Sequence, residues 1–279
     1  MGSAIAARLA SLGHEIMVWN RTADKARATG LPLAATPAEL AGRSEVVISI
    51  LTDARALEQV YGEMLAGNVR GKLFIEMSTV RPQAQQQLSR KAASSGAKFV
   101  ECPVGGTIGP AREGKLFGFA GGDAADVARA RPVLEQMCRR VEHVGPVGAG
   151  SRMKLAINLP LLVYWQALGE ALSLVRGLGI EPGRLIDILA DTSGAPNMMK
   201  NRAATVAGAL AGKEPGPVTV DIDTMKKDLA EMVEEIRSLG ASSLVAQAAL
   251  EGFTRASQAG LGAKDCSMLP VAWSARIKA

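Results

Sequence analysis

Short apolar runs alternate with helical patterns over the first half of the chain. A short apolar run between polar flanks is typical of a strand, whereas apolar positions three and four residues apart are typical of a helix. The predicted strands are Glu15–Trp19, Glu45–Leu51, Leu73–Met77, Lys98–Cys102, Leu116–Ala120 and Val141–Val144. The helices predicted between them are Ser3–Leu12, Ala23–Thr29, Arg55–Ala66, Gln83–Ser94 and Ala124–Cys138. This alternation predicts βαβ units, and therefore a parallel sheet with helices on both faces.

The second half of the chain contains helical patterns only. The predicted helices are 151–178, one that begins just after Glu181-Pro182, Met198–Ala211, Asp221–Leu239 and Ser242–Ala259. We therefore expect the α/β fold class in two domains, a doubly wound parallel sheet over residues 1–150 and an all-helical domain over residues 151–279. A long helix is expected to join them.

A lysine and an asparagine stand one helical turn apart at the start of the second half. Lys154 and Asn158 follow a glycine-rich turn and precede a long apolar run. Residues four apart on a helix lie on the same face, so the ammonium and the amide should lie one above the other. Such a pair is either a solvated helix start or part of an active site. The apolar run from Leu155 to Gly169 is too short for a bilayer and predicts a buried helix.

The composition is that of an ordinary globular protein. Of its 279 residues, 48% are hydrophobic, which is enough for a substantial core. The net charge of +5 is spread along the chain, which disfavours nucleic acid as a partner and suits anionic small molecules. The 3 scattered cysteines and 2 histidines predict reduced thiols and no metal site. No secretory signal pattern is visible, so we expect a cytoplasmic protein that does not span a membrane.

The chain opens inside a nucleotide-binding pattern. Such domains begin with a strand, then G-x-G-x-x-G, and then a helix whose N-terminus receives the pyrophosphate. Here Met1-Gly2 stands at the start of the helix, and only Gly2 matches the last glycine. The first strand is missing from this sequence, although it would be central and buried in the sheet. We therefore expect Met1 to be an internal methionine or the start of a truncated chain.

The residues that read the cofactor ribose should stand at the end of the strand Glu15–Trp19. NAD-binding sites usually carry Asp or Glu there, whereas this chain has Asn20, Arg21 and Thr22. The guanidinium of Arg21 can form charge-assisted hydrogen bonds to a 2′-phosphate, and Thr22 offers a hydroxyl. The segment therefore favours NADP over NAD. The alternative is an exposed Arg-Thr pair that simply starts the next helix.

Several motifs in order resemble those of the β-hydroxyacid dehydrogenase family, over essentially the whole chain. Met1-Gly2 resembles the end of the family's G-x-G-x-M-G, and Asn20-Arg21-Thr22 resembles its NADP-type ribose segment. The other similar motifs are Val46–Asp53, Glu76–Val80, Glu101–Thr107, Gly145–Asn158 and Lys227-Asp228-Leu229. The resemblance implies a Rossmann domain, an NADP(H) cofactor, a small substrate that carries a carboxylate, and a homodimer or homotetramer formed through the helical domain.

The resemblance also implies roles for single residues. The residues implied to bind the cofactor are Met1, Gly2, Asn20, Arg21, Thr22, Leu51, Thr52, Thr79 and Lys227. The substrate motif contains Gly105, Gly106 and Thr107, and the helical face of Lys154 adds Trp165 as a pocket wall. Gly105 replaces the serine of the family motif, and Thr107 replaces its second glycine. Main-chain N–H groups of Gly106 and Thr107 can still form an anion-binding nest.

Lys154 and Asn158 are the predicted catalytic residues. Reduction of an aldehyde requires a proton for the developing alkoxide, which a lysine ammonium can stabilise and protonate. The amide of Asn158 can bond the lysine and the substrate without adding a charge. We therefore expect an NADP-dependent oxidoreductase of the 3-hydroxyisobutyrate dehydrogenase type, which transfers a hydride between NADP(H) and a small 3-hydroxy acid or semialdehyde.

Two other functions are open to the sequence. An imine reductase resembles this architecture but usually lacks the catalytic lysine, so Lys154 argues against it. A non-catalytic NADP-binding scaffold module is favoured by the absent phosphate loop and disfavoured by Lys154 and Asn158. The related decarboxylating 6-phosphogluconate enzymes are longer and carry a histidine where this chain has Ile157.

Overall fold

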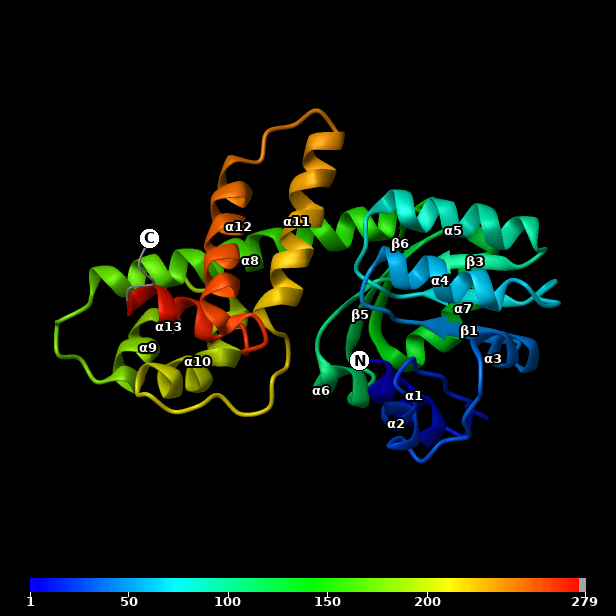
Figure 1. Ribbon diagram of the computed structural model, residues 1–279, viewed down its shortest axis with the longest axis horizontal. Coiled ribbons are helices and arrows are strands. Elements are labelled where there is room, and N and C mark those ends of the chain that lie inside the picture. The colour runs from blue at the N-terminus through cyan, green and yellow to red at the C-terminus, as the bar shows by residue number, and fades with distance from the viewer. Residues whose placement is uncertain (276–279) are drawn as a thin grey trace. The chain divides into compact units, whose positions relative to one another are not determined.

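The structure is a computed structural model that describes residues 1–275. The chain forms two compact units, Met1–Leu155 and Ala156–Ala279. The first unit contains a six-stranded sheet with helices, and the described part of the second unit is helical (Figure 1). The α/β fold class and the helical second half confirm the prediction from sequence. The units divide after Leu155, inside the long helix that the sequence predicts as the link.

The sheet has a parallel part and an antiparallel part. The strands are β1 (Val46–Ser49), β2 (Leu73–Glu76), β3 (Lys98–Glu101), β4 (Val104–Gly105), β5 (Leu116–Gly121) and β6 (Cys138–Gly145). β1, β2 and β3 pair in parallel, whereas β5 runs antiparallel to β3 and β4, and parallel to β6. The strand order is β1-β2-β3-β5-β4, with β6 on β5.

The direction of β5 differs from the fully parallel sheet that the sequence predicts. A parallel return needs a crossover of about a dozen residues or more, usually a full helix. Between β3 and β5 the chain forms only β4 and α6 (Ile108–Glu113), a helix of 6 residues. β4 follows directly after β3 and pairs antiparallel with β5, so the chain turns back beside β3 instead of crossing the sheet.

Helices cover both faces of the sheet, as the sequence predicts. The other helices of this unit are α1 (Gly2–Ser11), α2 (Ala23–Arg27), α3 (Pro37–Arg43), α4 (Ala54–Met64), α5 (Pro82–Ser94) and α7 (Ala124–Met137). Helices α1 and α7 pack with Leu73 and Ile75 in one apolar cluster, and α4 and α5 pack with Phe74 and Phe99 in another. Successive side chains of a strand point to opposite faces, so Phe74 and Ile75 belong to different clusters.

The prediction of a strand over Glu15–Trp19 is wrong, because these residues form no regular strand in the structure. Val18 forms only an isolated parallel bridge with Leu33. The N–H of Val18 donates to the carbonyl of Pro32 at 2.8 Å, and the N–H of Ala34 donates to the carbonyl of Val18 at 2.9 Å. A ladder needs a neighbouring strand along its whole length. Within residues 1–275, this isolated bridge is the only β-pairing formed by the segment Glu15–Trp19.

The described part of the second unit is built of helices. Their bounds are α8 (Ala149–Leu174), which begins in the first unit, α9 (Pro182–Ala190), α10 (Asn197–Leu210), α11 (Ile222–Ser238), α12 (Leu244–Ala256), the π-helical turn η1 (Ser257–Leu261) and α13 (Met268–Ser274). Helix α9 packs on α10, and α11 packs on α12 (Figure 1). Asp221 caps α11 by accepting a hydrogen bond from the N–H of Thr224 at 2.7 Å.

Helix α8 is long and apolar enough to cross a membrane, judged by length and composition alone. Core helices of globular proteins share both properties. The side chains of Leu155, Leu162, Trp165, Leu168 and Leu172 along α8 are buried inside the protein. Their spacing of three, four and seven residues is that of a helix packed along one face. The predicted buried helix is therefore buried on one face, whereas Met153 and Ile157 near its start are exposed.

Candidate active site

The carboxyl ends of β1 and β2 are joined at one edge of the sheet, the edge at which ligands bind in open α/β folds. The N–H of Leu51, just after β1, donates to the hydroxyl of Ser78, just after β2, at 2.7 Å. A Cβ on Gly2 would lie 3.2 Å from Cγ2 of Ile50, so the start of α1 lies against the end of β1. The structure thus brings Gly2, Leu51 and the Ser78-Thr79 turn to the same edge, as the motifs predict.

The N-terminus of α1 has the properties of an anion site. Met1 precedes this 10-residue helix without a side-chain cap bond, and the first turn contains no acidic residue. The first N–H groups of a helix lack partners within it, and the helix dipole favours negative charge there. Met1 and Gly2 therefore fit the pyrophosphate of a dinucleotide.

The predicted ribose-reading residues form an exposed turn before α2. The side-chain carbonyl of Asn20 accepts a hydrogen bond from the N–H of Thr22 at 2.9 Å. This bond shapes the turn, because Asn side chains commonly bond their own backbone two residues on. Arg21 and Thr22 are exposed. The guanidinium of Arg21 is therefore accessible to the phosphate of a nucleotide without any rearrangement of the chain.

A buried glutamate holds the turn that carries Thr79. Glu76, the last residue of β2, has no exposed surface. Its carboxylate accepts hydrogen bonds from the N–H of Ser78 at 3.0 Å, from the hydroxyl of Ser78, and from Nε2 of Gln85 at 2.5 Å. Burial raises the pKa of Glu76 from 4.5 to about 7, although these hydrogen bonds act in the opposite direction.

A second buried glutamate meets the start of α8. Glu101 stands opposite Glu76 in the parallel register of β2 and β3. Its carboxylate accepts hydrogen bonds from the main chain of Gly148 and Gly150 and from the main chain and hydroxyl of Ser151. Burial raises the pKa of Glu101 above its usual value, against the lowering effect of these donors.

The predicted substrate loop contains one glycine that the fold requires and one that it does not. Gly106 has φ of 125°, and a Cβ there would lie 2.7 Å from Cδ2 of Leu116. Only glycine suits this position. At Gly105, by contrast, a Cβ would have no neighbouring atom closer than 3.9 Å. The position therefore has room for the serine that the family motif carries there. Thr107 is exposed and precedes α6 without forming a side-chain cap bond.

Lys154 lies in the second turn of α8 with 8% of its surface exposed. Lysines are rarely buried to this extent. Asn158 follows one turn later on the same helix and is half-buried. Asn158, Trp165 and Lys227 belong to the second unit, whereas Lys154 belongs to the first.

Two of the predicted site residues in the second unit are Trp165, which is buried, and Lys227, which forms an ion pair. Trp165 has no exposed surface, which supports a role in packing more than a role in substrate contact. Lys227 lies on α11, where its ammonium is 2.6 Å from the carboxylate of Asp228.

The remaining predicted cofactor residues lie in the first unit. There Thr52 is exposed and Thr79 is half-buried.

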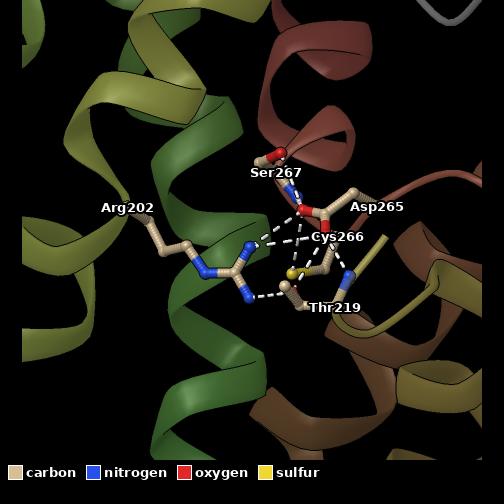
Figure 2. A network of polar contacts seen from close by, with 5 residues as sticks. All are labelled: Arg202, Thr219, Asp265, Cys266 and Ser267. Atoms are coloured by element: carbon tan, nitrogen blue, oxygen red, sulfur yellow. Dashed lines mark hydrogen bonds and ion pairs between the residues drawn. The ribbon is translucent and has the colours of Figure 1, made fainter. Parts of the chain in front are cut away.

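The second unit contains a polar network around Asp265, which has 2% of its surface exposed. Its carboxylate is 3.1 Å from the guanidinium of Arg202 and accepts from the N–H of Thr219 at 3.0 Å and the hydroxyl of Ser267 at 2.8 Å (Figure 2). Nearby, the N–H of Cys266 donates to the carbonyl of Val220 at 3.0 Å. The network therefore fastens the segment before α11, the helix that carries Lys227.

Neither the cysteines nor the acidic residues form a metal site. Within residues 1–275, no group of three or more His, Cys, Asp and Glu side chains is placed to hold a metal ion. Cys102, Cys138 and Cys266 are buried and free of disulfides. Burial raises the pKa of each thiol, which keeps it protonated.

The buried carboxylates are the main feature that the sequence analysis missed. Glu76 and Glu101 stand at the first positions of two motifs in which only later residues were predicted to bind cofactor or substrate. One signal was available, because a charged residue that ends a short apolar strand faces either solvent or a partner. Their partners Gln85, Gly148 and Ser151 follow 9, 47 and 50 residues later, and no local pattern links such positions.

Two family sequence models match the chain. Residues 1–145 match the NAD binding domain of 6-phosphogluconate dehydrogenase, and residues 148–271 match the model described as NAD-binding of NADP-dependent 3-hydroxyisobutyrate dehydrogenase. Together with the sheet and the helices on both of its faces, these matches define the class. The protein is an oxidoreductase that uses a nicotinamide cofactor.

Similar proteins narrow this class to one family. Glyoxylate/succinic semialdehyde reductase 1 of Arabidopsis thaliana is 31% identical over 96% of this chain and 93% of that protein. A 3-hydroxyisobutyrate dehydrogenase of Pseudomonas aeruginosa is 34% identical over 70% of this chain and 67% of that protein. The solved structure of Mycobacterium tuberculosis 3-hydroxyisobutyrate dehydrogenase with L-serine has a TM-score of 0.83 at 26% identity, over 97% of this chain and 94% of that one. The chain belongs to the β-hydroxyacid dehydrogenase family.

Proposed function

We propose that the protein transfers a hydride between NADP(H) and a small 3-hydroxy acid or the corresponding semialdehyde. The observation that carries this proposal is the burial of Lys154, a charged side chain with 8% exposure on the helix that follows the sheet. The names of the relatives, reductases of glyoxylate and succinic semialdehyde and a 3-hydroxyisobutyrate dehydrogenase, support this substrate class.

NADPH supplies the hydride when it is bound. The ammonium of Lys154 holds the carbonyl oxygen of the substrate and gives it a proton as the alkoxide forms. In the oxidative direction, the neutral amine accepts the proton of the hydroxyl. Asn158 bonds the same oxygen and the amine, which fixes their orientation. Main-chain N–H groups of Gly106 and Thr107 hold the carboxylate of the substrate.

Turnover by a lysine variant tests the proposed reaction. The substrates are small semialdehydes, glyoxylate and 3-hydroxy acids, and Lys154→Ala should lower kcat by about 10²- to 10⁴-fold, the usual range for a lost proton donor. NADPH affinity, measured by fluorescence titration, should change little, because Lys154 acts on the substrate. A variant that turns over near the wild-type rate would contradict the role of Lys154.

The preference for NADP rests on Arg21 and Thr22, which are exposed beside the predicted ribose position. A guanidinium contact to the 2′-phosphate contributes about 1.5–3 kcal/mol, or roughly 10- to 100-fold in kcat/KM. Arg21→Ala should therefore lower kcat/KM with NADPH by that factor and leave kcat/KM with NADH almost unchanged. Equal losses with both nucleotides would show that Arg21 does not read the phosphate.

The same assays separate the two alternative functions. An imine reductase would reduce cyclic imines and leave semialdehydes and glyoxylate untouched. A scaffold module would give no saturable NADPH signal and no turnover with any substrate. Lys154 disfavours both alternatives, because neither needs a buried amine at that position.

We further propose that the protein is cytoplasmic and forms a homodimer or homotetramer through its helical unit. Large apolar side chains on that unit support assembly, among them Leu174, Leu178, Leu244 and Val245, which are exposed by 87%, 63%, 78% and 66%. Light scattering after size-exclusion chromatography measures the assembly directly, and a monomer at micromolar concentration would contradict it.

A further inference from the structure

Glu101 joins the end of β3 to the start of α8. Its side chain has no exposed surface. One carboxylate oxygen accepts from the N–H of Gly148 at 2.5 Å and of Gly150 at 2.9 Å. The other accepts from the N–H of Ser151 at 3.3 Å and from its hydroxyl at 2.7 Å. All these donors belong to the first residues of α8 or to the turn directly before it.

The backbone around this carboxylate leaves it just enough room. A Cβ on Gly121 would clash with the carboxylate of Glu101 and would lie 2.9 Å from the carbonyl oxygen of Pro146. A Cβ on Gly150 would clash with the carbonyl oxygen of Phe119 and lie 3.3 Å from the carboxylate of Glu101. Side chains at either position would push the carboxylate away from its donors, so the absence of a Cβ at both is part of the same arrangement.

A negative charge on Glu101 is favourable at the N-terminus of α8. Helix N-termini carry a partial positive charge and unpaired N–H groups, and a carboxylate satisfies both. Hydrogen bonds to an ionised acceptor are roughly twice as strong as neutral ones. The carboxylate therefore holds the first turn of α8 more firmly than a hydroxyl or amide cap would.

We propose that Glu101 is a positioning residue for Lys154. Lys154 follows Ser151 by three residues, less than one helical turn, so the bonds of Glu101 to Ser151 fix the turn from which the lysine extends. In the other direction, Glu101 leads through Cys102-Pro103 into the substrate loop at Gly105. One carboxylate thus sets the proton donor relative to the strand that carries this loop. The inference rests on the proposed function, because it concerns the reaction in which Lys154 gives the proton.

Glu101→Gln tests this role at nearly constant volume. The amide oxygen can still accept from Gly148 and Gly150, but the NH₂ group then faces the N–H of Ser151, donor against donor. We expect kcat to fall by roughly 10- to 100-fold, because a displacement of about 1 Å in a catalytic group costs up to about 10²-fold. The KM for NADPH should change little. Glu101→Asp keeps the charge on a shorter side chain, and it should recover part of kcat.

Asp123→Asn is the matched control. Asp123 is an acidic cap in the same unit, where its carboxylate accepts from the N–H of Ala125 at 2.9 Å and of Asp126 at 3.4 Å at the start of α7. Like Glu101→Gln, this change removes the charge and keeps an acceptor oxygen, and it does not touch α8. We expect Asp123→Asn to change Tm little and to leave kcat unchanged. Glu101→Gln should lower kcat beyond anything that its own shift in Tm explains.

Hydrogen exchange gives a readout that does not depend on activity. The amides of residues 150–155 should exchange faster in Glu101→Gln than in Asp123→Asn and the wild type. A wild-type kcat in Glu101→Gln would overturn the inference, and should that variant not fold, wild-type exchange of residues 150–155 in Glu101→Asp, whose shorter side chain reaches the donors less well, would overturn it. Unchanged exchange at the start of α8 would overturn it as well. A wild type that turns over no substrate would instead refute the proposed function, and the exchange data would still decide whether Glu101 holds the helix.

Discussion

Buried carboxylates occur in both units of the molecule, and their pKa values shift in opposite directions. Glu76 and Glu101 have no exposed surface, and Asp265 has 2%. Burial raises the pKa of Glu76 from 4.5 to about 7. Burial also acts to raise the pKa of Asp265, but hydrogen bonds from Thr219 and Ser267 and the charge of Arg202 outweigh it and bring the pKa from 3.8 to about 2. Low solvent exposure alone therefore does not set the pKa of a carboxylate.

Asp265 lies less deeply inside the protein than Glu76, and both its hydrogen bonds and a facing cation favour its ionised form. Arg202 places a guanidinium 3.1 Å from Asp265 (Figure 2), and an opposite charge at that distance favours the ionised form. The donors to Glu76 are neutral, a hydroxyl, a main-chain N–H and the amide of Gln85. Asp265 thus stays ionised at neutral pH, whereas Glu76 takes up and releases its proton near neutral pH.

The largest expected effect comes from removing the cation. Arg202→Met leaves Asp265 buried without its counter-charge, which should lower the free energy of unfolding by about 3–5 kcal/mol. Urea unfolding in a Trp19→Phe background measures this, because Trp165 and Trp273 then report on the second unit alone. The double variant Arg202→Met/Asp265→Asn should recover part of the loss. A loss below about 1 kcal/mol, the value of an exposed ion pair, would contradict the role of Arg202 as the counter-charge of buried Asp265.

The next effect concerns pH in the first unit. Between pH 4.5 and about 7, folded Glu76 keeps a proton that the unfolded chain has released. Raising the pH through this window therefore lowers stability, by at most about 1.4 kcal/mol per pH unit from this group. Glu76→Gln is neutral in both states and should flatten the dependence, as measured by urea unfolding across the window. Identical slopes in variant and wild type would show that Glu76 is ionised throughout.

The pH dependence of Asp265 has the opposite sign. Its folded pKa is about 2 and its ordinary value is 3.8, so its stabilising contribution is present above about pH 4. That contribution is lost as the pH falls from about 4 toward 2. At these acid pH values the second unit therefore loses the stabilisation from ionised Asp265, whereas Glu76 is already protonated in the folded and in the unfolded chain.

The smallest of these effects comes from a single donor. Ser267→Ala removes the hydroxyl that bonds Asp265 at 2.8 Å but leaves Arg202 in place. The loss should be about 1.5 kcal/mol, typical of one hydrogen bond to a charged group. The same fluorescence assay measures it. A loss equal to that of Arg202→Met would mean that the hydrogen bonds, not the cation, hold this carboxylate.

Local patterns in the sequence predict most helices and strands closely. Helix α7 and strand β5 begin at the predicted residues, because Asp123 caps the helix and a continuous apolar run marks the strand. Helix α3 (Pro37–Arg43) was missed, although its N-cap Thr36, its first-turn proline and Glu39 form a recognisable start signal. The strand Glu15–Trp19 failed because a strand depends on a neighbour, which composition does not supply.

The candidate site could be predicted only where family motifs mark it. Lys154, Gly106 and the Ser78-Thr79 turn stand in such motifs, and the structure places them at the sheet edge or on the helix that follows. The partners of Glu101 lie 47 to 50 residues away, and its bonds run mostly to main-chain groups, which carry no residue-type signature. Whether a carboxylate is buried against a cation or against neutral donors depends equally on the fold.

The most direct test of the account is the rate of hydride transfer in a single turnover, in wild type and Lys154→Ala. The protein with bound NADPH is mixed rapidly with a small semialdehyde, and the loss of reduced-nicotinamide absorbance is followed. We expect the rate to fall by at least about 10²-fold in Lys154→Ala, with NADPH affinity nearly unchanged. A hydride-transfer rate in that variant within a few-fold of wild type would contradict the claim that Lys154 serves the reaction.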